Sequence, residues 1–200
     1  MAFIANTAFQ PLVTNHEFDS IANITGIYTT DGDIENAEVC SAGFLCVKSA
    51  LSLNQGYEAA TIINSNTWTM VPAESTTTVG EAIYACNTFD VNEIADPITG
   101  AIYKVGSNTL GLPEQAGKPC TFTQIKFDGA SIYRFGEGNI DGTLSTEQFL
   151  TIDDGLLAPA ASAPATNGVP YFAIVNGGVF TQGAYAGFGY VDVIAKVAVA

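Results

Sequence analysis

Few side chains in this sequence could carry acid–base chemistry at neutral pH. The chain has one histidine, His16, and one arginine, Arg134, against 20 aspartates and glutamates. Imidazole and guanidinium groups perform much of the proton transfer, metal binding and phosphate binding of proteins at this pH. Glu17 follows His16, but no second histidine and no Gly-x-Ser-x-Gly turn completes a nucleophilic triad. The sequence therefore predicts a protein that is not an enzyme and has no catalytic residues.

One acidic segment has the alternation of carboxylates that a calcium site uses. Asp31-Gly-Asp-Ile-Glu35 places carboxylates at the first, third and fifth positions. The EF-hand loop also needs glycine at the sixth position and glutamate at the twelfth, where this chain has Ala42. We interpret this segment, and the looser group Asp90, Glu93 and Asp96, as solvated acidic loops. No metal site is expected.

The four cysteines do not form a recognisable metal or redox motif. Cys40, Cys46, Cys86 and Cys120 contain no Cys-x-x-Cys pair, and His16 is remote from them in sequence. On one strand, Cys40 and Cys46 would share a face. We expect four buried free thiols that act as small apolar side chains, with a disulfide as the alternative.

The glycines of Gly136-Glu-Gly-Asn-Ile-Asp-Gly142 superficially resemble a phosphate-binding loop. Their spacing departs from the dinucleotide fingerprint, no helix pattern follows, and Glu137 and Asp141 would repel phosphate. This segment is therefore predicted to be a turn, and no cofactor is expected. The net charge of −14 also argues against a nucleic-acid partner, because such binding depends on Lys and Arg.

Length and composition indicate a folded chain of one domain or two small ones. Its 200 residues are 48% hydrophobic and only 13% charged, which leaves enough apolar surface for a sizeable core. No run approaches the roughly 20 apolar residues that cross a bilayer, so no membrane partner is expected. The start, Met1-Ala-Phe-Ile-Ala-Asn6, lacks the basic residues of a signal peptide, which predicts synthesis in a cytoplasm without export by a leader.

The pattern of turns and strands predicts a mainly β fold: a sandwich or barrel-like body of ten to twelve short antiparallel strands, with under a tenth helix. Asp128-Gly129 and Asn176-Gly177-Gly178 each separate two β-rich runs, which is the pattern of a hairpin. The last strand alternates, with Val191, Val193, Ala195, Val197 and Val199 on one face. Ser145-Thr-Glu-Gln148 is the best candidate for a helical turn. Further strands are expected at 38–48, 59–64, 67–71, 81–86, 88–94 and 101–105.

Four segments are predicted along the chain. They are an extended N-terminal arm (1–35), a β body (36–156), a Pro/Ala-rich connection (157–170) and C-terminal β strands with a hairpin, packed on the body (171–200). The arm is apolar but has no regular period, which is typical of a segment that lies across another surface, either the body of its own chain or a neighbouring subunit. We expect it to form an interface with neighbouring subunits through Phe3, Phe9, Leu12, Phe18 and Ile21.

Several stretches resemble small structural proteins of tailed-phage virions. They are Val105-Gly-Ser-Asn-Thr-Leu-Gly-Leu112, the run through Lys126 and Arg134 to Phe135-Gly-Glu-Gly-Asn139, the Ala/Pro connection, and Gly189-Tyr-Val-Asp-Val-Ile194. The nearest similarity is to head decoration (capsid cement) proteins, with tail-tube and head-fibre proteins close to them. The resemblance implies a β-rich, non-enzymatic virion protein that decorates and stabilises the outside of a phage capsid. Its implied partners are the major capsid protein and copies of itself.

Two other classes of function remain open. A carbohydrate- or surface-binding β module would use exposed aromatic rings, for which Trp68, Tyr84, Tyr103 and Tyr185 are the candidates. A hydrolase would need a pair of carboxylates such as Asp153 and Asp154.

Overall fold

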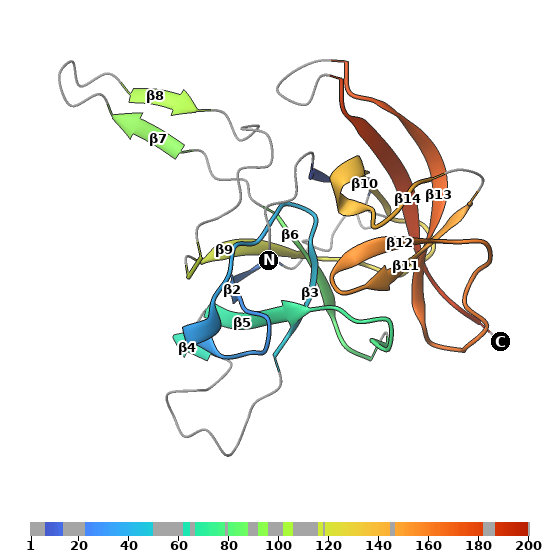
Figure 1. Cartoon of the computed structure of the whole chain (residues 1–200), viewed down its shortest axis with the longest axis horizontal. Helices are drawn as coiled ribbons and strands as arrows, with labels where there is room; N and C mark the ends of the chain where they lie inside the picture. Colours follow the sequence, from blue (N-terminus) through green and yellow to red (C-terminus); the bar gives the residue numbers. More distant parts are fainter. Residues whose placement is uncertain are drawn as a thin grey trace.

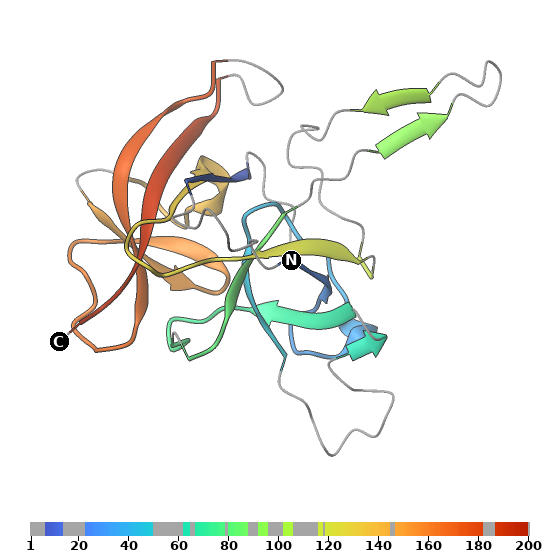
Figure 2. The ribbon, with the colours of Figure 1, turned by 180° about the vertical axis from the view of Figure 1, so that it is seen from behind.

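The chain folds into two β units, a small barrel and a six-stranded sheet, that lie side by side (Figures 1 and 2). The computed structural model describes residues 7–13, 23–49, 62–64, 67–78, 80–87, 92–95, 102–105, 116–117, 119–144, 147–181 and 187–199. This architecture confirms the predicted mainly β fold with a barrel-like body. The described part holds fourteen strands, more than the ten to twelve expected, because many strands are only three to five residues long.

Five strands close the barrel, in the order β2-β9-β6-β3-β5 and back to β2. Four of the five contacts are antiparallel, and the closing contact between β2 and β5 is parallel. At this seam Gly26 lies opposite Trp68, and a Cβ atom on Gly26 would stand 2.5 Å from Met70. The strands are β2 (Asn23–Tyr28), β3 (Leu45–Lys48), β5 (Thr67–Pro72), β6 (Ile83–Cys86) and β9 (Cys120–Gln124), with β4 (Ile62–Asn64) attached to β5.

The second unit is an antiparallel sheet in the order β1-β10-β14-β13-β11-β12. Its strands are β1 (Phe9–Val13), β10 (Ile132–Gly136), β11 (Phe149–Asp153), β12 (Leu156–Ala160), β13 (Pro170–Val179) and β14 (Gly189–Val197). A separate two-stranded ribbon consists of β7 (Asn92–Ala95) and β8 (Ile102–Val105). The described helices are two single 3-10 turns, η1 (Ile34–Asn36) and η3 (Glu137–Asn139). In the described part of the chain, no helix has the length and apolar character needed to span a bilayer.

One hydrophobic cluster joins the two units. Leu45 and Ile83 of the barrel are buried in it together with Tyr133 and Phe172 of the sheet. A second cluster fills the barrel and contains all four cysteines with Tyr28, Phe44, Met70, Tyr84 and Phe122. The shared cluster indicates that the barrel and the sheet stabilise each other.

Backbone hydrogen bonds reinforce this junction at the turn between β11 and β12. Leu45 N–H donates to the Gly155 carbonyl (2.8 Å), Gly155 N–H to Ala73 (2.8 Å) and Ala73 N–H to Leu45 (2.9 Å). Gly155 has φ +75°, and an added Cβ would lie 2.3 Å from the Phe44 ring. Only glycine therefore fits at this position without displacing the barrel core.

The last strand follows the predicted alternation over most of its length. Val191, Val193 and Ala195 are buried in the shared cluster, whereas Val199 lies beyond the strand and is exposed. Asp192 points to the other face and is nevertheless buried, because it pairs with Arg134.

The predicted hairpin at Asp128-Gly129 is wrong: the chain turns there, but the strands on either side do not pair with each other. Gly129 has φ +75°, and the Asp128 carboxylate accepts hydrogen bonds from the N–H groups of Ala130 (2.9 Å) and Ser131 (2.7 Å). The flanking strands do not pair with each other: β9 belongs to the barrel and β10 to the sheet. A turn dipeptide fixes only local geometry, and here the chain uses it to cross between the two units.

The predicted turn at Asn176-Gly177-Gly178 is also wrong. These residues continue β13 and pair with Asp192, Val191 and Tyr190 of β14. A register shift between Ile174 and Asn176 marks a β-bulge in β13. The bulge and the two glycines interrupt the alternation of side chains that identifies a strand in the sequence. The chain reverses later, where Phe180 N–H donates to the Phe188 carbonyl (2.9 Å).

The described parts of the predicted segments are distributed over both units. Within the segment 1–35, the described residues supply β1 to the sheet and β2 to the barrel. The segment 157–170 begins within β12, and the strands of 171–200 pair with β10 and β11, which come from the expected body. Parts of the expected strands 59–64 and 88–94, and Ser145 with Thr146 of the expected helical turn, lie outside the described residues. Glu147 and Gln148 are not helical.

The arm residues that were predicted to face a partner differ in their exposure to solvent. Phe9 is 5% exposed in the shared core, where its ring packs against Tyr133 and Phe135, so it is not available to a neighbouring subunit. Leu12, on the same strand, is 41% exposed. Phe3, Phe18 and Ile21 lie outside the described residues.

Candidate binding site beside the β13–β14 hairpin

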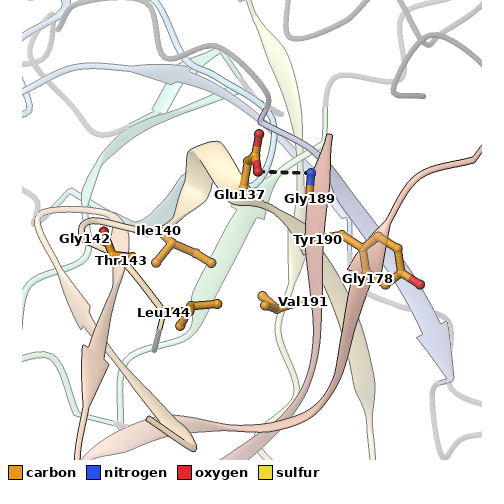
Figure 3. A pocket seen from close by; sticks show the side chains of 9 residues that line it. All are labelled: Glu137, Ile140, Gly142, Thr143, Leu144, Gly178, Gly189, Tyr190 and Val191. Carbon is orange, nitrogen blue, oxygen red and sulfur yellow. Dashed lines mark hydrogen bonds between the residues drawn. The ribbon is translucent and has the colours of Figure 1, made fainter. Parts of the chain in front are cut away.

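A pocket of about 270 Å³ lies between the η3 turn and the long β13–β14 hairpin (Figure 3). Its polar lining includes Glu137 and Thr143, and its apolar lining includes Ile140, Leu144 and Val191. The hairpin contributes Tyr190 and two glycines to the wall. This combination offers one carboxylate, one hydroxyl and a small apolar floor.

The glycines are needed because the backbone and side chains approach closely here. Glu137 Oε2 accepts a hydrogen bond from Gly189 N–H at 3.1 Å (Figure 3). A Cβ on Gly189 would stand 2.6 Å from that oxygen, and a Cβ on Gly178 would stand 2.8 Å from the Tyr190 hydroxyl. The Glu137 carboxylate is thus partly used in fixing the hairpin to the η3 turn.

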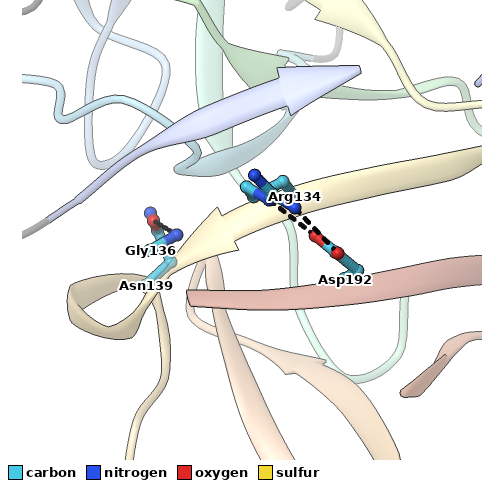
Figure 4. Close-up of polar contacts among 4 residues, drawn as sticks. All are labelled: Arg134, Gly136, Asn139 and Asp192. Carbon is cyan, nitrogen blue, oxygen red and sulfur yellow. Dashed lines mark hydrogen bonds and ion pairs between the residues drawn. The ribbon is translucent and has the colours of Figure 1, made fainter. Parts of the chain in front are cut away.

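Asn139, the last residue of η3, fixes this turn to its surroundings through its side chain (Figure 4). Its side-chain oxygen accepts from Ala8 N–H (3.0 Å) and Gly136 N–H (3.2 Å), while its amide nitrogen donates to the Ala42 carbonyl (2.7 Å). The residue is 1% exposed. One asparagine therefore ties together the strand β10, the start of β1 and the loop before β3.

The only arginine of the chain is engaged next to this pocket. Arg134 on β10 and Asp192 on β14 are directly opposite, and Nε and Nη2 donate to the two carboxylate oxygens at 2.7 and 2.9 Å (Figure 4). The hydrogen bond to Asp192 raises the pKa of Arg134 above its ordinary value. The guanidinium carbon also lies 3.8 Å from the centre of the Tyr190 ring. The Tyr190 ring packs against the ring of Phe180 as well.

These contacts limit what the pocket can do chemically. The Arg134 guanidinium is committed to Asp192, so it is poorly placed to bind an incoming phosphate or carboxylate. Arg134 and Phe180 both pack against the Tyr190 ring, which leaves less of it for stacking on a sugar. The arrangement is suited to holding the hairpin rigidly, and sequence reasoning missed it because Arg134, Glu137 and Asp192 share no motif.

The acidic loop predicted to be solvated uses its carboxylates within the loop itself. Asp31 accepts hydrogen bonds from Asp33 N–H (2.9 Å) and from the Asn36 side chain (2.8 Å), and Asp33 caps η1 through Glu35 N–H (3.1 Å). These backbone and side-chain hydrogen bonds lower the pKa of Asp31. Among the described residues, no group of three or more His, Cys, Asp or Glu side chains is arranged to hold a metal ion.

The other predicted candidates do not form a site in the described part of the chain. Asp153 and Asp154 are exposed where β11 turns into β12. Tyr84 is buried, and Lys48 lies 4.0 Å from the centre of the Trp68 ring and 5.6 Å from that of Tyr84, so these two rings do not form an open platform. Glu93 lies on β7 and Tyr103 on β8. His16, Glu17, Asp90, Asp96 and Tyr185 lie outside the described residues.

All four cysteines are buried and free, as the sequence predicted. Burial raises the pKa of Cys40 and Cys46, which makes them poor nucleophiles. Their convergence in one barrel was not visible in the sequence, because their spacing matches no motif.

A second surface lies on the outer half of the same hairpin, at residues 175–179 of β13. The neighbouring strand β11 pairs with β13 only as far as Ala173, and Ile174 N–H donates to Gln148. Beyond that point no described strand pairs with this edge, and residues 175–179 are all exposed, with Val175 at 54% and Val179 at 55%. We call this segment the open edge of β13; it lies on a hairpin that extends away from the barrel (Figure 1).

Comparison with protein-family models, with curated proteins and with solved structures finds no match for this chain.

Proposed function

We propose that this protein is a non-enzymatic structural component of a phage virion that decorates and stabilises the outside of the capsid. The observation that carries the proposal is the open edge of β13. An unpaired strand edge presents N–H and C=O groups that can pair with a strand of another protein. Its partners in this role are the major capsid protein and further copies of the chain.

The side chains of this edge suit such pairing. Charged residues, particularly lysine, and prolines usually protect exposed strand edges, whereas residues 175–179 read Val-Asn-Gly-Gly-Val. Val175 and Val179 would supply apolar contact, and Gly177 with Gly178 would allow close approach of a second backbone. A capsid repeats the same contact many times, so a weak individual contact is sufficient.

The charge of the protein supports a position on the outer surface. With a net charge of −14, the chain is repelled by packaged nucleic acid. Its single arginine is paired with Asp192, which leaves no arginine for binding phosphates.

The test is co-sedimentation of the full chain with intact, purified capsids. The wild-type protein should sediment with them, and the double variant Val175→Lys/Val179→Lys should bind at least about tenfold more weakly, since each buried valine contributes about 1.5 kcal/mol or more. Val199→Lys is the matched control, because Val199 is 87% exposed and lies away from the hairpin. Equal binding by the double variant, or no sedimentation of the wild type, would contradict the proposal.

The alternative functions give different results in parallel assays. Binding to purified tail tubes or head fibres, without binding to capsids, would assign the chain to those parts of the virion. Retention on a glycan array without capsid binding would favour a carbohydrate-binding module. Geometry favours this last function least, because the rings of Trp68 and Tyr190 already contact Lys48 and Arg134.

A further inference from the structure

The pocket beside the β13–β14 hairpin and the open edge of β13 are parts of one surface. Gly178 belongs to the open edge and also lines the pocket. Its neighbour Gly177 lies opposite Val191 of β14, and directly opposite residues share a face of the sheet. Val191 lines the pocket too (Figure 3). The edge and the pocket are therefore continuous along the hairpin.

Glycine at position 177 leaves the way from the edge to the pocket open. A Cβ atom on Gly177 would lie 3.9 Å from Val191 Cγ1, so a side chain there would stand beside the valine of the pocket floor. Because Gly177 has none, a large side chain on an added strand can lie across it and reach the apolar lining, which consists of Ile140, Leu144 and Val191. Aromatic side chains cover glycines of neighbouring strands in this way.

The backbone of the open edge is oriented to accept an added strand. Phe180 N–H donates across the hairpin to the Phe188 carbonyl (2.9 Å). Successive residues of a strand direct their backbone groups to alternate sides, so Gly178 also points toward β14, whereas Gly177 and Val179 point away from it. These two residues offer their N–H and C=O groups to a strand outside the sheet. A partner residue opposite either of them has its side chain on the face of the pocket.

The charge of this surface favours a basic partner segment. Val179 lies opposite Gly189, and a Cβ on Gly189 would stand 2.6 Å from Glu137 Oε2, so the Glu137 carboxylate lies on the face of the pocket floor. Glu137 is exposed, and the chain has a net charge of −14. Neighbouring side chains on one face of a strand are two residues apart, as Gly177 and Val179 are. A cation two residues from the side chain over Gly177 would therefore lie toward this carboxylate.

We propose that the open edge and the pocket together bind one extended segment of the major capsid protein by addition of a β-strand. The segment carries a large apolar side chain, aromatic or long aliphatic, opposite Gly177, and this side chain fills the pocket. A lysine or arginine two residues away lies toward Glu137. Main-chain hydrogen bonds supply affinity, and the pocket selects among segments. This inference rests on the proposed function, since it uses the same edge and names the chemistry of the segment that the edge takes.

The experiment titrates the isotopically labelled full chain with the peptide acetyl-Thr-Lys-Val-Phe-Val-Lys-Thr-amide and follows the backbone amide signals by nuclear magnetic resonance. Both lysines share a face with the phenylalanine, so the test does not depend on the direction of the added strand. We expect signals to shift at residues 140–144, 175–179 and 189–191. A peptide with glycine in place of phenylalanine should bind at least about tenfold more weakly, because the pocket then remains unfilled.

Variants of the chain locate the side chain of the peptide. Thr143→Trp places a bulky ring at the pocket and should weaken binding of the phenylalanine peptide to the level of the glycine peptide. Thr166→Trp is the matched control, because Thr166 is also an exposed threonine that lines a pocket, but a different one beside Thr151 of β11. Glu137→Gln keeps an oxygen that can accept from Gly189 N–H and removes the charge. It should reduce the preference for lysine over glutamate in the peptide.

The proposal is overturned if the phenylalanine and glycine peptides bind equally well, or if neither shifts the hairpin signals at millimolar concentration. Equal binding of the phenylalanine peptide by Thr143→Trp and Thr166→Trp would overturn it as well. Equal binding of a peptide with glutamate in place of both lysines would overturn the basic character of the segment. These measurements need no capsids. Peptide binding by a chain that does not sediment with capsids would support the site and contradict the capsid role.

Discussion

At the scale of single residues, the pair of Arg134 and Asp192 shows how this acidic chain uses its few cations. The carboxylate is 9% exposed and the guanidinium side chain 22%, and two hydrogen bonds join them. A buried carboxylate without its partner is costly, whereas two apolar residues of similar size can replace such a pair with little loss. Arg134 therefore stabilises mainly by neutralising Asp192.

We expect Arg134→Met to lower the free energy of unfolding by about 2–3 kcal/mol, less than a fully buried pair would give because Arg134 is partly exposed. The double variant Arg134→Met/Asp192→Leu should recover at least half of that loss. Urea denaturation of the wild type, the two single variants Arg134→Met and Asp192→Leu, and the double variant measures these values. A double variant as unstable as the sum of the two single changes would refute this account.

The lowered pKa of Asp128 predicts that the stability of the fold depends on pH. Desolvation tends to raise the pKa of its carboxyl, but hydrogen bonds from Ser131 N–H, Ala130 N–H and the Ser131 hydroxyl outweigh this and hold the pKa below its ordinary value of 3.8. Because the folded-state pKa is lower than the unfolded one, the contribution is fully present above the unfolded pKa. It is lost as the pH falls through the folded-state pKa.

Asp128→Ala should therefore reduce the melting temperature at neutral pH, and the difference from wild type should shrink as the pH falls below the ordinary pKa of 3.8. Thermal unfolding followed by circular dichroism across this range makes the comparison. Asp153→Ala is the control, because Asp153 is an exposed carboxylate on β11. A difference that stays constant with pH would show that the charge of Asp128 is unimportant.

At the scale of elements, sequence reasoning succeeded where a strand alternates and failed where glycines occur within strands. The buried face of β14 follows from Val191, Val193 and Ala195 alone. Gly177 and Gly178 looked like a turn because glycine marks turns, but in β13 glycine is needed for close approach to β14. Asp128-Gly129 forms a turn, as its sequence predicts. The dipeptide does not determine the strand pairing, because β9 is buried in the barrel and β10 in the sheet.

The turn between β11 and β12 gives a sharp test of steric fit. Gly155 and Gly168 both have positive φ, +75° and +83°, but only Gly155 has a neighbour within reach, the Phe44 ring. Gly168→Ala should cost about 1–2 kcal/mol through backbone strain alone. Gly155→Ala should cost at least about 2 kcal/mol more, because Phe44 must also move. Equal losses by chemical denaturation would show that the core at Phe44 is loosely packed.

At the scale of the whole molecule, the N-terminal segment belongs to both units. The sequence shows that this segment is rich in apolar residues, but it could not decide whether the chain itself or a partner covers them. Of the two predicted interface residues that the structure describes, Phe9 is buried and Leu12 is 41% exposed. Phe9 answers this for β1, since its ring lies between Tyr133 and Phe135. The convergence of the cysteines was hidden for the same reason: it depends on long-range strand order.

Two residues of β1 allow this assignment to be tested. Phe9→Ala should lower the free energy of unfolding by about 3–5 kcal/mol, as for other buried aromatic residues. Leu12→Ala, on the same strand but 41% exposed, should cost well under half as much. Chemical denaturation of both variants gives the comparison. A small effect of Phe9→Ala would mean that the ring faces a partner in solution.

The parallel seam between β2 and β5 also gives the molecule an optical reporter. Trp68 is the only tryptophan of the chain, it lies opposite Gly26 at the closing contact, and the ammonium group of Lys48 rests on its ring. Opening of the barrel would change the polarity around this one indole and remove the adjacent cation. Its fluorescence therefore follows the barrel alone, whereas the far-ultraviolet dichroism follows the strands of both units. Coincident transitions by the two signals would mean that the barrel and the sheet melt as one cooperative body.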